Sequence, residues 1–179
     1  GVGYHAEGEI TPGENSFDTT SNMSLHALLK AGLLCNDSTL KRDGERWRVE
    51  GDPTEGALIV SAMKAGYDPS VLEQEMPRLD TIPFESARQY MATLHDQGEG
   101  KPRLLFVKGS IESICLDCAT MMGPDGEPDV PTQGAVANWV ELMADKGLRV
   151  LAFAQKEMPP DTTRITHADV EEGLLFIGL

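Results

Sequence analysis

The sequence predicts an α/β fold of the α+β type, in which a largely antiparallel, twisted sheet of about six or seven strands is flanked by helices. Helix and strand signals are both present, and the middle of the chain carries three successive strand-like segments with no helix between them. A doubly wound parallel sheet requires strict alternation of strand and helix. Strands joined by short polar turns therefore indicate antiparallel hairpins instead.

Length, composition and charge indicate a globular protein. The 179 residues are enough to bury a core as a single domain over 1–179, and 40% of them are hydrophobic. The formal net charge of −14 repels polyanions, which argues against a nucleic-acid or anionic-membrane binder. No apolar run approaches the roughly 20 residues of a membrane span. The three cysteines are too few for a disulfide framework, and their odd number suits a reducing cytosol.

The N-terminal part is expected to begin with a short strand within residues 1–12, followed by a loop. Ser21 can cap a helix that ends near Asn36, because leucines recur close to the helical period at Leu25, Leu28, Leu29 and Leu33. Residues 40–49 have the pattern of a hairpin whose turn lies at 42–45.

The strongest helix signal starts at Asp52. Asp52 is a favourable N-cap residue, Pro53 suits the first helical position, and Glu55 stands three residues after the cap, as in a capping box. Gly66 can end this helix, and a second short helix is expected before Pro77.

The second half of the chain combines strands with helices. Strands are expected over 79–84, 90–95, 104–108 and 148–154, with a further strand at the end of the chain. Helices are expected after Ser110, from Thr132 to a stop at Gly147, and after the capping pair Thr166 and Asp169. Residues 123–126 have the composition of an exposed turn.

Four short segments carry most of the functional information. They are Gly51-Asp52-Pro53-Thr54-Glu55-Gly56-Ala57, residues 83–91 (PFESARQYM), Lys108-Gly109-Ser110 and Leu148-Arg149-Val150-Leu151-Ala152. In order and spacing they resemble the nucleotide-binding (N) domain signatures of P-type ATPases, with type II cation pumps such as the calcium and sodium/potassium pumps as the most similar class. The resemblance covers essentially the whole chain and implies an N-domain-like fold that binds ATP.

The resemblance implies an adenine pocket with Phe84 as its aromatic wall. An exposed aromatic ring can stack on a base for about 1–3 kcal/mol, although a Phe taken alone is more often a core residue. Lys108, followed by Gly109, is implied at the deep end of the pocket as a point charge; the alternative is a solvated strand-end Lys. Glu55 is implied as the acceptor for the adenine amino group, and its alternative role is that of a capping-box partner.

The resemblance also places Arg149 toward the nucleotide phosphates, because its guanidinium matches phosphate oxygens, with Leu151 against the base or ribose. The alternatives are a surface Arg and a core Leu. Ser86 at the pocket rim, Arg88 and Gln89 complete the predicted site. Many family members carry a Lys where this chain has Gln89, so a charge for phosphate binding is missing. Arg88 is a doubtful replacement, since adjacent residues on a strand point to opposite faces.

The implied function is that of the ATP-binding domain of a cation-transporting pump, a cytoplasmic domain of an integral membrane protein. It would hold adenosine so that the γ-phosphate of ATP (Mg-ATP in the full-length pump) reaches an Asp in the D-K-T-G-T segment of a phosphorylation domain. The present residues contain no D-K-T-G-T. The chain is therefore expected to be an excised monomeric piece that binds ATP or ADP without hydrolysing it. Its other partners would be the phosphorylation and actuator domains of a parent ATP hydrolase that moves calcium or another small cation.

Two other functions stay open at this point. One is an N-domain-like regulatory or interaction module that has lost nucleotide binding, which Gln89 and the net charge favour slightly. The other is a free-standing hydrolase, for which no nucleophile–base arrangement and no Walker A loop can be found. No catalytic residue and no metal site is expected, because Cys115 and Cys118 form a single C-x-x-C pair and the four histidines are scattered.

Overall fold

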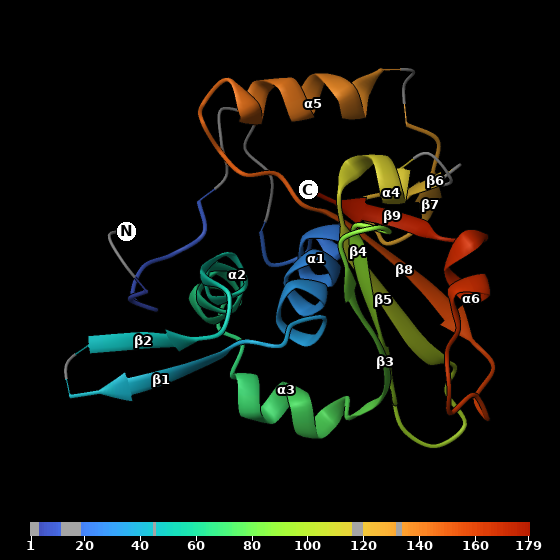
Figure 1. The fold of residues 1–179 in the computed structure, drawn as a ribbon, viewed down its shortest axis with the longest axis horizontal. Coiled ribbons are helices and arrows are strands. Elements are labelled where there is room, and N and C mark those ends of the chain that lie inside the picture. The colour runs from blue at the N-terminus through green and yellow to red at the C-terminus, as the bar shows by residue number, and fades with distance from the viewer. Residues whose placement is uncertain (1–3, 12–18, 45, 116–119, 132–133) are drawn as a thin grey trace.

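A seven-stranded sheet organises the part of the chain that this computed structural model describes, namely residues 4–11, 19–44, 46–115, 120–131 and 134–179. The strand order is β3-β4-β5-β8-β9-β6-β7 (Figure 1). The strands are β3 (Arg78–Glu85), β4 (Tyr90–His95), β5 (Arg103–Gly109), β6 (Thr120–Met122), β7 (Pro128–Asp129), β8 (Ala152–Met158) and β9 (Leu175–Gly178). The pairings are antiparallel apart from that of β6 with β9. The predicted α/β fold with a largely antiparallel sheet is confirmed.

Helices cover both faces of the sheet (Figure 1). On one side lie α1 (Met23–Leu34), α2 (Pro53–Lys64) and α3 (Pro69–Glu75), together with a separate hairpin of β1 (Thr39–Asp43) and β2 (Arg46–Glu50). On the other side lie α4 (Ile111–Cys115) and α6 (His167–Glu171). The remaining helix, α5 (Ala135–Ala144), runs along one end of the molecule, and none of its residues is fully buried.

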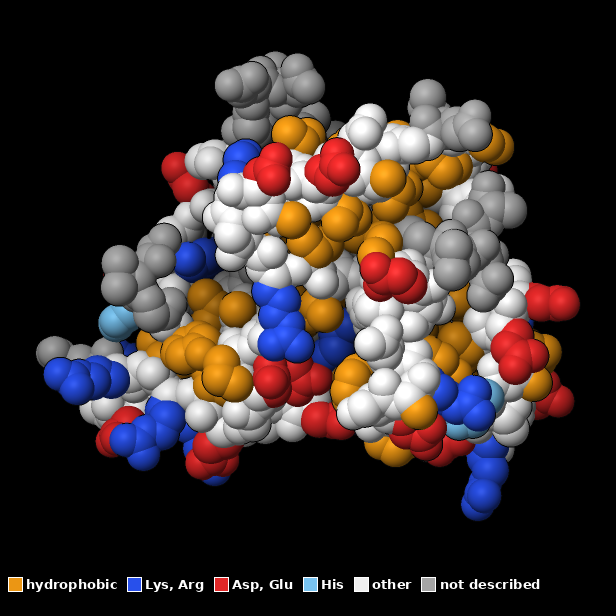
Figure 2. Space-filling model, turned by 45° about the horizontal axis from the view of Figure 1, so that its top comes forward, with side chains coloured by type: hydrophobic (Ala, Val, Ile, Leu, Met, Phe, Trp, Pro, Cys, Tyr) orange, Lys and Arg blue, Asp and Glu red, His pale blue; other side chains and the backbone are white. Residues whose placement is uncertain are grey.

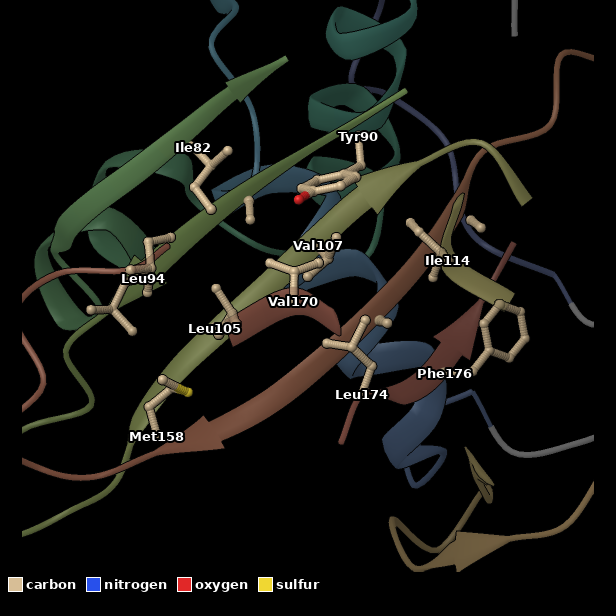
Figure 3. Close-up of a cluster of buried hydrophobic side chains, with 14 residues drawn as sticks. Ile82, Tyr90, Leu94, Leu105, Val107, Ile114, Met158, Val170, Leu174 and Phe176 are labelled. Carbon is tan, nitrogen blue, oxygen red and sulfur yellow. The ribbon is translucent and has the colours of Figure 1, made fainter. Parts of the chain in front are cut away.

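Alternation along β5 decides which side chains reach which face. Phe106 belongs to the hydrophobic cluster under α1, whereas the next residue, Val107, belongs to the cluster on the opposite face (Figure 3). Lys108 follows Val107 and therefore returns to the side of α1 and α2. In register, Met91 of β4 and Phe153 of β8 flank Lys108. A charged side chain is thus directed into an otherwise apolar layer.

The N-terminal part differs from the prediction in two ways. Residues 4–11, the described part of the expected first strand, form no strand. The first helix is capped by Asn22 and not by Ser21, because the Asn22 side chain accepts a hydrogen bond from the third helical amide at 2.9 Å. The first helical amide, that of Met23, is bonded to the Pro124 carbonyl at 2.7 Å, which ties the helix start to the turn between β6 and β7.

The strand expected over 148–154 begins only at Ala152. Its neighbour β5 ends at Gly109, which pairs with Ala152, so the preceding residues have no β5 residue to pair with. Arg149 and Leu151 therefore lie in the connection between α5 and the sheet.

The other predicted elements are present, including the hairpin, the Asp52-capped helix, and the capping box of Thr166 with Asp169. The short strands β6 and β7 were not predicted, although the turn expected between them is closed by the Gly123 amide on the Glu127 carbonyl at 2.8 Å. The start of the helix expected from residue 132 falls outside the described residues. Among those that are described, no helix combines the length and the apolar character that crossing a bilayer requires.

Candidate functional site

A cavity of about 300 Å³ opens where the start of α2, the loop after α1, the ends of β3 to β5 and the connection before β8 meet. Its wall contains Asp37, Asp52, Thr54, Glu55, Phe84, Met91, Lys108, Gly109, Arg149 and Leu151. Of the residues predicted to form a site, the fold thus brings together Glu55, Phe84, Lys108, Gly109, Arg149 and Leu151.

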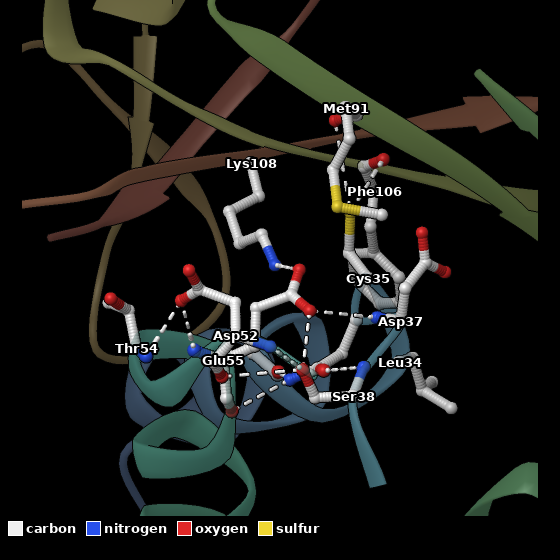
Figure 4. Close-up of polar contacts among 12 residues, drawn as sticks. Leu34, Cys35, Asp37, Ser38, Asp52, Thr54, Glu55, Met91, Phe106 and Lys108 are labelled. Carbon is white, nitrogen blue, oxygen red and sulfur yellow. Dashed lines mark hydrogen bonds and ion pairs between the residues drawn. The ribbon is translucent and has the colours of Figure 1, made fainter. Parts of the chain in front are cut away.

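A buried ion pair lies in the wall of this cavity. The Lys108 ammonium contacts Oε1 of Glu55 at 2.6 Å, and the two side chains are only 6% and 15% exposed (Figure 4). Burying two charges is costly unless each finds a partner. The pair therefore explains how a Lys can stand between Met91 and Phe153 in the apolar layer.

The second oxygen of Glu55 is held by the loop after α1. Oε2 accepts hydrogen bonds from the Asp37 amide at 3.2 Å and from the Ser38 hydroxyl at 2.9 Å (Figure 4). The capping-box role considered for Glu55 does not occur, because the Asp52 amide is bonded to Ser38 Oγ at 2.8 Å. Asp52 itself caps α2 as expected, with its carboxylate accepting from the Thr54 amide at 2.7 Å.

Phe84 stands at the rim of the cavity with 59% of its surface exposed, near the end of β3. The alternative of a core Phe is therefore wrong. The pairing of β3 with β4 is irregular between Ile82 and Glu85, and such irregularities re-aim side chains at strand ends. Leaving a Phe side chain exposed forgoes about 1.5–3 kcal/mol of burial, which directs attention to a ligand that would cover it.

Arg149 adds a positive charge to the cavity wall. It is exposed, and among the described residues no carboxylate oxygen lies within ion-pair distance of it. Hydrogen bonding from Thr54 lowers the pKa of Asp52, and the nearby Arg149 guanidinium lowers it further. Asp52 therefore stays ionised near the helix start, where negative charge is favourable.

Three predicted residues lie outside the cavity wall. Ser86, Arg88 and Gln89 belong to the turn between β3 and β4. Arg88 pairs with Glu85 at 3.4 Å. Gln89 adopts a left-handed φ of 58°, and its carbonyl accepts from the Ser110 amide at 2.9 Å. The predicted roles of Ser86 at the pocket rim, and of Arg88 and Gln89 near the phosphates, stay predictions.

Sequence reasoning missed Asp37 and Ser38, which hold Glu55. The only sequence signal was a polar Asn36-Asp37-Ser38 run after a helix. Nothing in its spacing indicated that this run would fold against residue 55. The C-x-x-C pair noted in the sequence includes Cys118, which lies outside the described residues.

Comparison with known proteins identifies similar sequences. A family model described as the P-type ATPase cytoplasmic domain N matches residues 24–179. A cation-transporting ATPase pma1 of Synechocystis sp. is 52% identical over 155 residues, which are 87% of this chain and 17% of that protein. A probable cation-transporting ATPase F of Mycobacterium tuberculosis is 44% identical over 132 residues, which are 74% of this chain and 14% of that protein.

A more distant relative covers slightly more of the chain. Calcium-transporting ATPase 1 of Lactococcus lactis is 35% identical over 174 residues, which are 94% of this chain and 19% of that protein. The chain thus spans less than a fifth of the length of these curated relatives.

Proposed function

This chain belongs to the family of cytoplasmic N domains of P-type ATPases, and on that premise we propose that its cavity binds the adenosine part of ATP. The observation that carries the proposal is an exposed Phe84 ring at the rim of a cavity of about 300 Å³ whose wall holds the buried Glu55–Lys108 pair. A planar, weakly polar base would cover the ring and gain about 1–3 kcal/mol by stacking.

The Glu55–Lys108 pair suits one edge of adenine. An adenine presents an amino donor beside a ring-nitrogen acceptor. Here an acceptor, Glu55 Oε1, lies 2.6 Å from a donor, the Lys108 ammonium. Oε1 has two lone-pair directions, of which Lys108 uses one. Glu55 would accept from the amino group while Lys108 donates to the neighbouring ring nitrogen.

The triphosphate would leave the cavity on the side of Arg149, whose fork of donors matches phosphate oxygens. Among the described residues of the cavity wall, only Lys108 and Arg149 carry a positive charge, and the whole chain has a net charge of −14. We therefore expect the phosphate groups to add little to the affinity. We expect AMP, ADP and ATP to bind within about tenfold of one another, with Kd on the order of 1 mM.

In the parent protein the domain would position ATP, as Mg-ATP, so that the γ-phosphate meets an Asp of a phosphorylation domain. The parent would be an integral membrane pump that hydrolyses ATP and moves a small cation, with this domain in the cytoplasm. The chain alone would bind nucleotide as a monomer without turnover, and its partners would be the phosphorylation and actuator domains. These are inferences from relatives that are five or more times longer.

Titration calorimetry with ATP, ADP and AMP tests the proposal. Phe84→Ala is expected to weaken binding by about tenfold or more, because stacking is lost. Leu142→Ala is the matched control, since Leu142 is 60% exposed and Phe84 59%. Lys108→Ala should also remove most binding, whereas Lys156→Ala should not, because the Lys156 ammonium is bonded to the Asp169 and Glu172 carbonyls far along β8.

Wild-type affinity in both Phe84→Ala and Lys108→Ala would contradict the proposal. Absence of nucleotide binding by the wild-type chain would favour an N-domain-like interaction module instead. Hydrolysis of ATP by the chain alone would favour a free-standing hydrolase.

A further inference from the structure

Ser38 lies between the start of α2 and the Glu55 carboxylate and is 7% exposed. Its oxygen accepts from the Asp52 amide at 2.8 Å and lies 2.9 Å from Glu55 Oε2. The Asp52 carbonyl is also near, at 3.3 Å, but a hydroxyl has one hydrogen to donate. The shorter, charge-assisted bond to the carboxylate is the stronger one. The Ser38 hydroxyl therefore donates to Glu55.

The loop that carries Ser38 is fixed against α2. The Asn36 amide group donates to the Gly32 carbonyl at 2.9 Å and to the Glu55 carbonyl at 3.0 Å, and its oxygen accepts from the Ser38 amide at 2.9 Å. Gly51 packs so tightly that a Cβ there would lie 2.3 Å from Ser38 Oγ. The hydrogen bonds of Asn36 and the close packing of Gly51 hold this loop from two sides. The Ser38 hydroxyl therefore has a defined position relative to Glu55.

The two oxygens of Glu55 differ in what they can still accept. The Asp37 amide and the Ser38 hydroxyl occupy both lone-pair directions of Oε2. Oε1 accepts from Lys108 and keeps a second lone-pair direction, and both residues belong to the cavity wall. The Glu55 carboxylate can therefore accept only one more hydrogen bond, at Oε1, whose position is fixed.

We propose that Ser38, with the Asp37 amide, is a positioning residue that makes the cavity select 6-amino purines over 6-oxo purines. This inference rests on the proposed function. A 6-amino purine has an N–H donor at C6 and an acceptor at N1, whereas a 6-oxo purine has an acceptor at C6 and an N–H donor at N1. If Oε1 is fixed beside C6, it accepts a hydrogen bond from the amino group of a 6-amino purine. In a 6-oxo purine it faces an oxygen, which has no hydrogen to donate. A carboxylate released from Ser38 can turn and accept from the N1–H of a 6-oxo purine, so selectivity falls more than affinity.

The experiment compares the Kd of AMP with that of IMP in the wild-type chain and in Ser38→Ala. The wild type is expected to prefer AMP. Ser38→Ala should reduce the AMP-over-IMP ratio by roughly two- to tenfold, the value of one hydrogen bond. Ser38→Cys, which keeps the shape with a weaker donor, should fall between the two.

A double-variant comparison separates positioning from a merely structural role. In a Glu55→Ala chain, which has no side-chain oxygen at position 55 for Ser38 to hold, adding Ser38→Ala should leave the ratio unchanged. Ser61→Ala is the matched control, since the Ser61 hydroxyl donates at 2.8 Å to the Leu58 carbonyl within the same helix. It should leave the ratio at the wild-type value.

An AMP-over-IMP ratio that survives Ser38→Ala would overturn the assignment, as would an equal loss in the Glu55→Ala background. If Ser38→Ala does not fold, Ser38→Cys supports the same comparison. A wild-type chain that binds neither AMP nor IMP would overturn the proposed function as well. A wild type that binds both without preference would overturn this inference alone.

Discussion

The buried Glu55–Lys108 pair leads to an asymmetric prediction about stability. Glu55→Leu removes the counter-charge of an ammonium that is 6% exposed, and the described residues offer it no second carboxylate at ion-pair distance. Lys108→Met removes the ammonium but leaves the Glu55 carboxylate with its bonds from the Asp37 amide and the Ser38 hydroxyl. Of the two changes, loss of Glu55 should therefore destabilise the chain more.

The magnitudes follow from the partners that each variant leaves behind. An uncompensated buried charge costs about 3–5 kcal/mol, which is the expected loss for Glu55→Leu. Lys108→Met removes one charge-assisted hydrogen bond from a carboxylate that keeps two, for about 1–2 kcal/mol. Adding Lys108→Met to Glu55→Leu removes the stranded charge and should return about 1–3 kcal/mol.

Urea unfolding at pH 7 without nucleotide measures these free energies, and a constant m value is required for the comparison. Nucleotide is left out because a ligand of the folded state would add its own stabilisation. Equal losses in the two single variants would refute the reasoning about partners. A double variant as unstable as the sum of the two losses would show that the charges are not coupled.

Two further predictions concern the scaffold. The His95 ring is buried and bonded to the Met76 carbonyl at 3.0 Å and the Thr93 hydroxyl at 2.9 Å, and burial lowers the pKa of His95 from 6.5 to about 4. The unfolded chain therefore binds a proton between pH 6.5 and 4 that the folded chain does not. About 2–3 kcal/mol of the free energy of unfolding, present above pH 6.5, should be lost as the pH falls to 4. In urea unfolding across this range, the free energy of unfolding of His95→Asn should decline less steeply than that of the wild type. The same decline in both chains would contradict the assignment. Gly56→Ala should destabilise the chain by about 1–3 kcal/mol despite the higher helix propensity of Ala, because the added Cβ would lie 2.3 Å from a methyl of the stiff Val49 side chain. In a Val49→Ala chain, where this methyl is absent, Gly and Ala at position 56 should give nearly the same urea midpoint.

Local signals predicted much of the fold correctly. Asp52 and Pro53 mark a helix start whatever surrounds them, and the short apolar run before Lys108 indicates a strand without reference to its neighbours. The prediction that a strand starts at residue 148 was wrong, because the start of β8 depends on where its partner β5 ends. That information lies in another part of the chain.

The candidate site was predictable only in part for the same reason. The resemblance selected Glu55 and Lys108 as separate nucleotide contacts, and the sequence gives no sign that residues 53 positions apart neutralise each other. Ser38 was overlooked because its importance arises from contacts with Glu55 and Asp52 that only the folded chain creates. A turn residue such as Gln89 matches the family signature by position, but it is not among the residues of the cavity wall, and its role beside the phosphates stays a prediction.

The most direct test of the central claim is a set of intermolecular nuclear Overhauser effects between the Phe84 ring protons and the H2 and H8 protons of AMP bound to the chain. Stacking on the exposed ring predicts contacts from Phe84 to the base protons, accompanied by shifts of the Glu55 and Lys108 side-chain signals. Bound AMP whose base protons show contacts to other side chains and none to Phe84 would contradict the account.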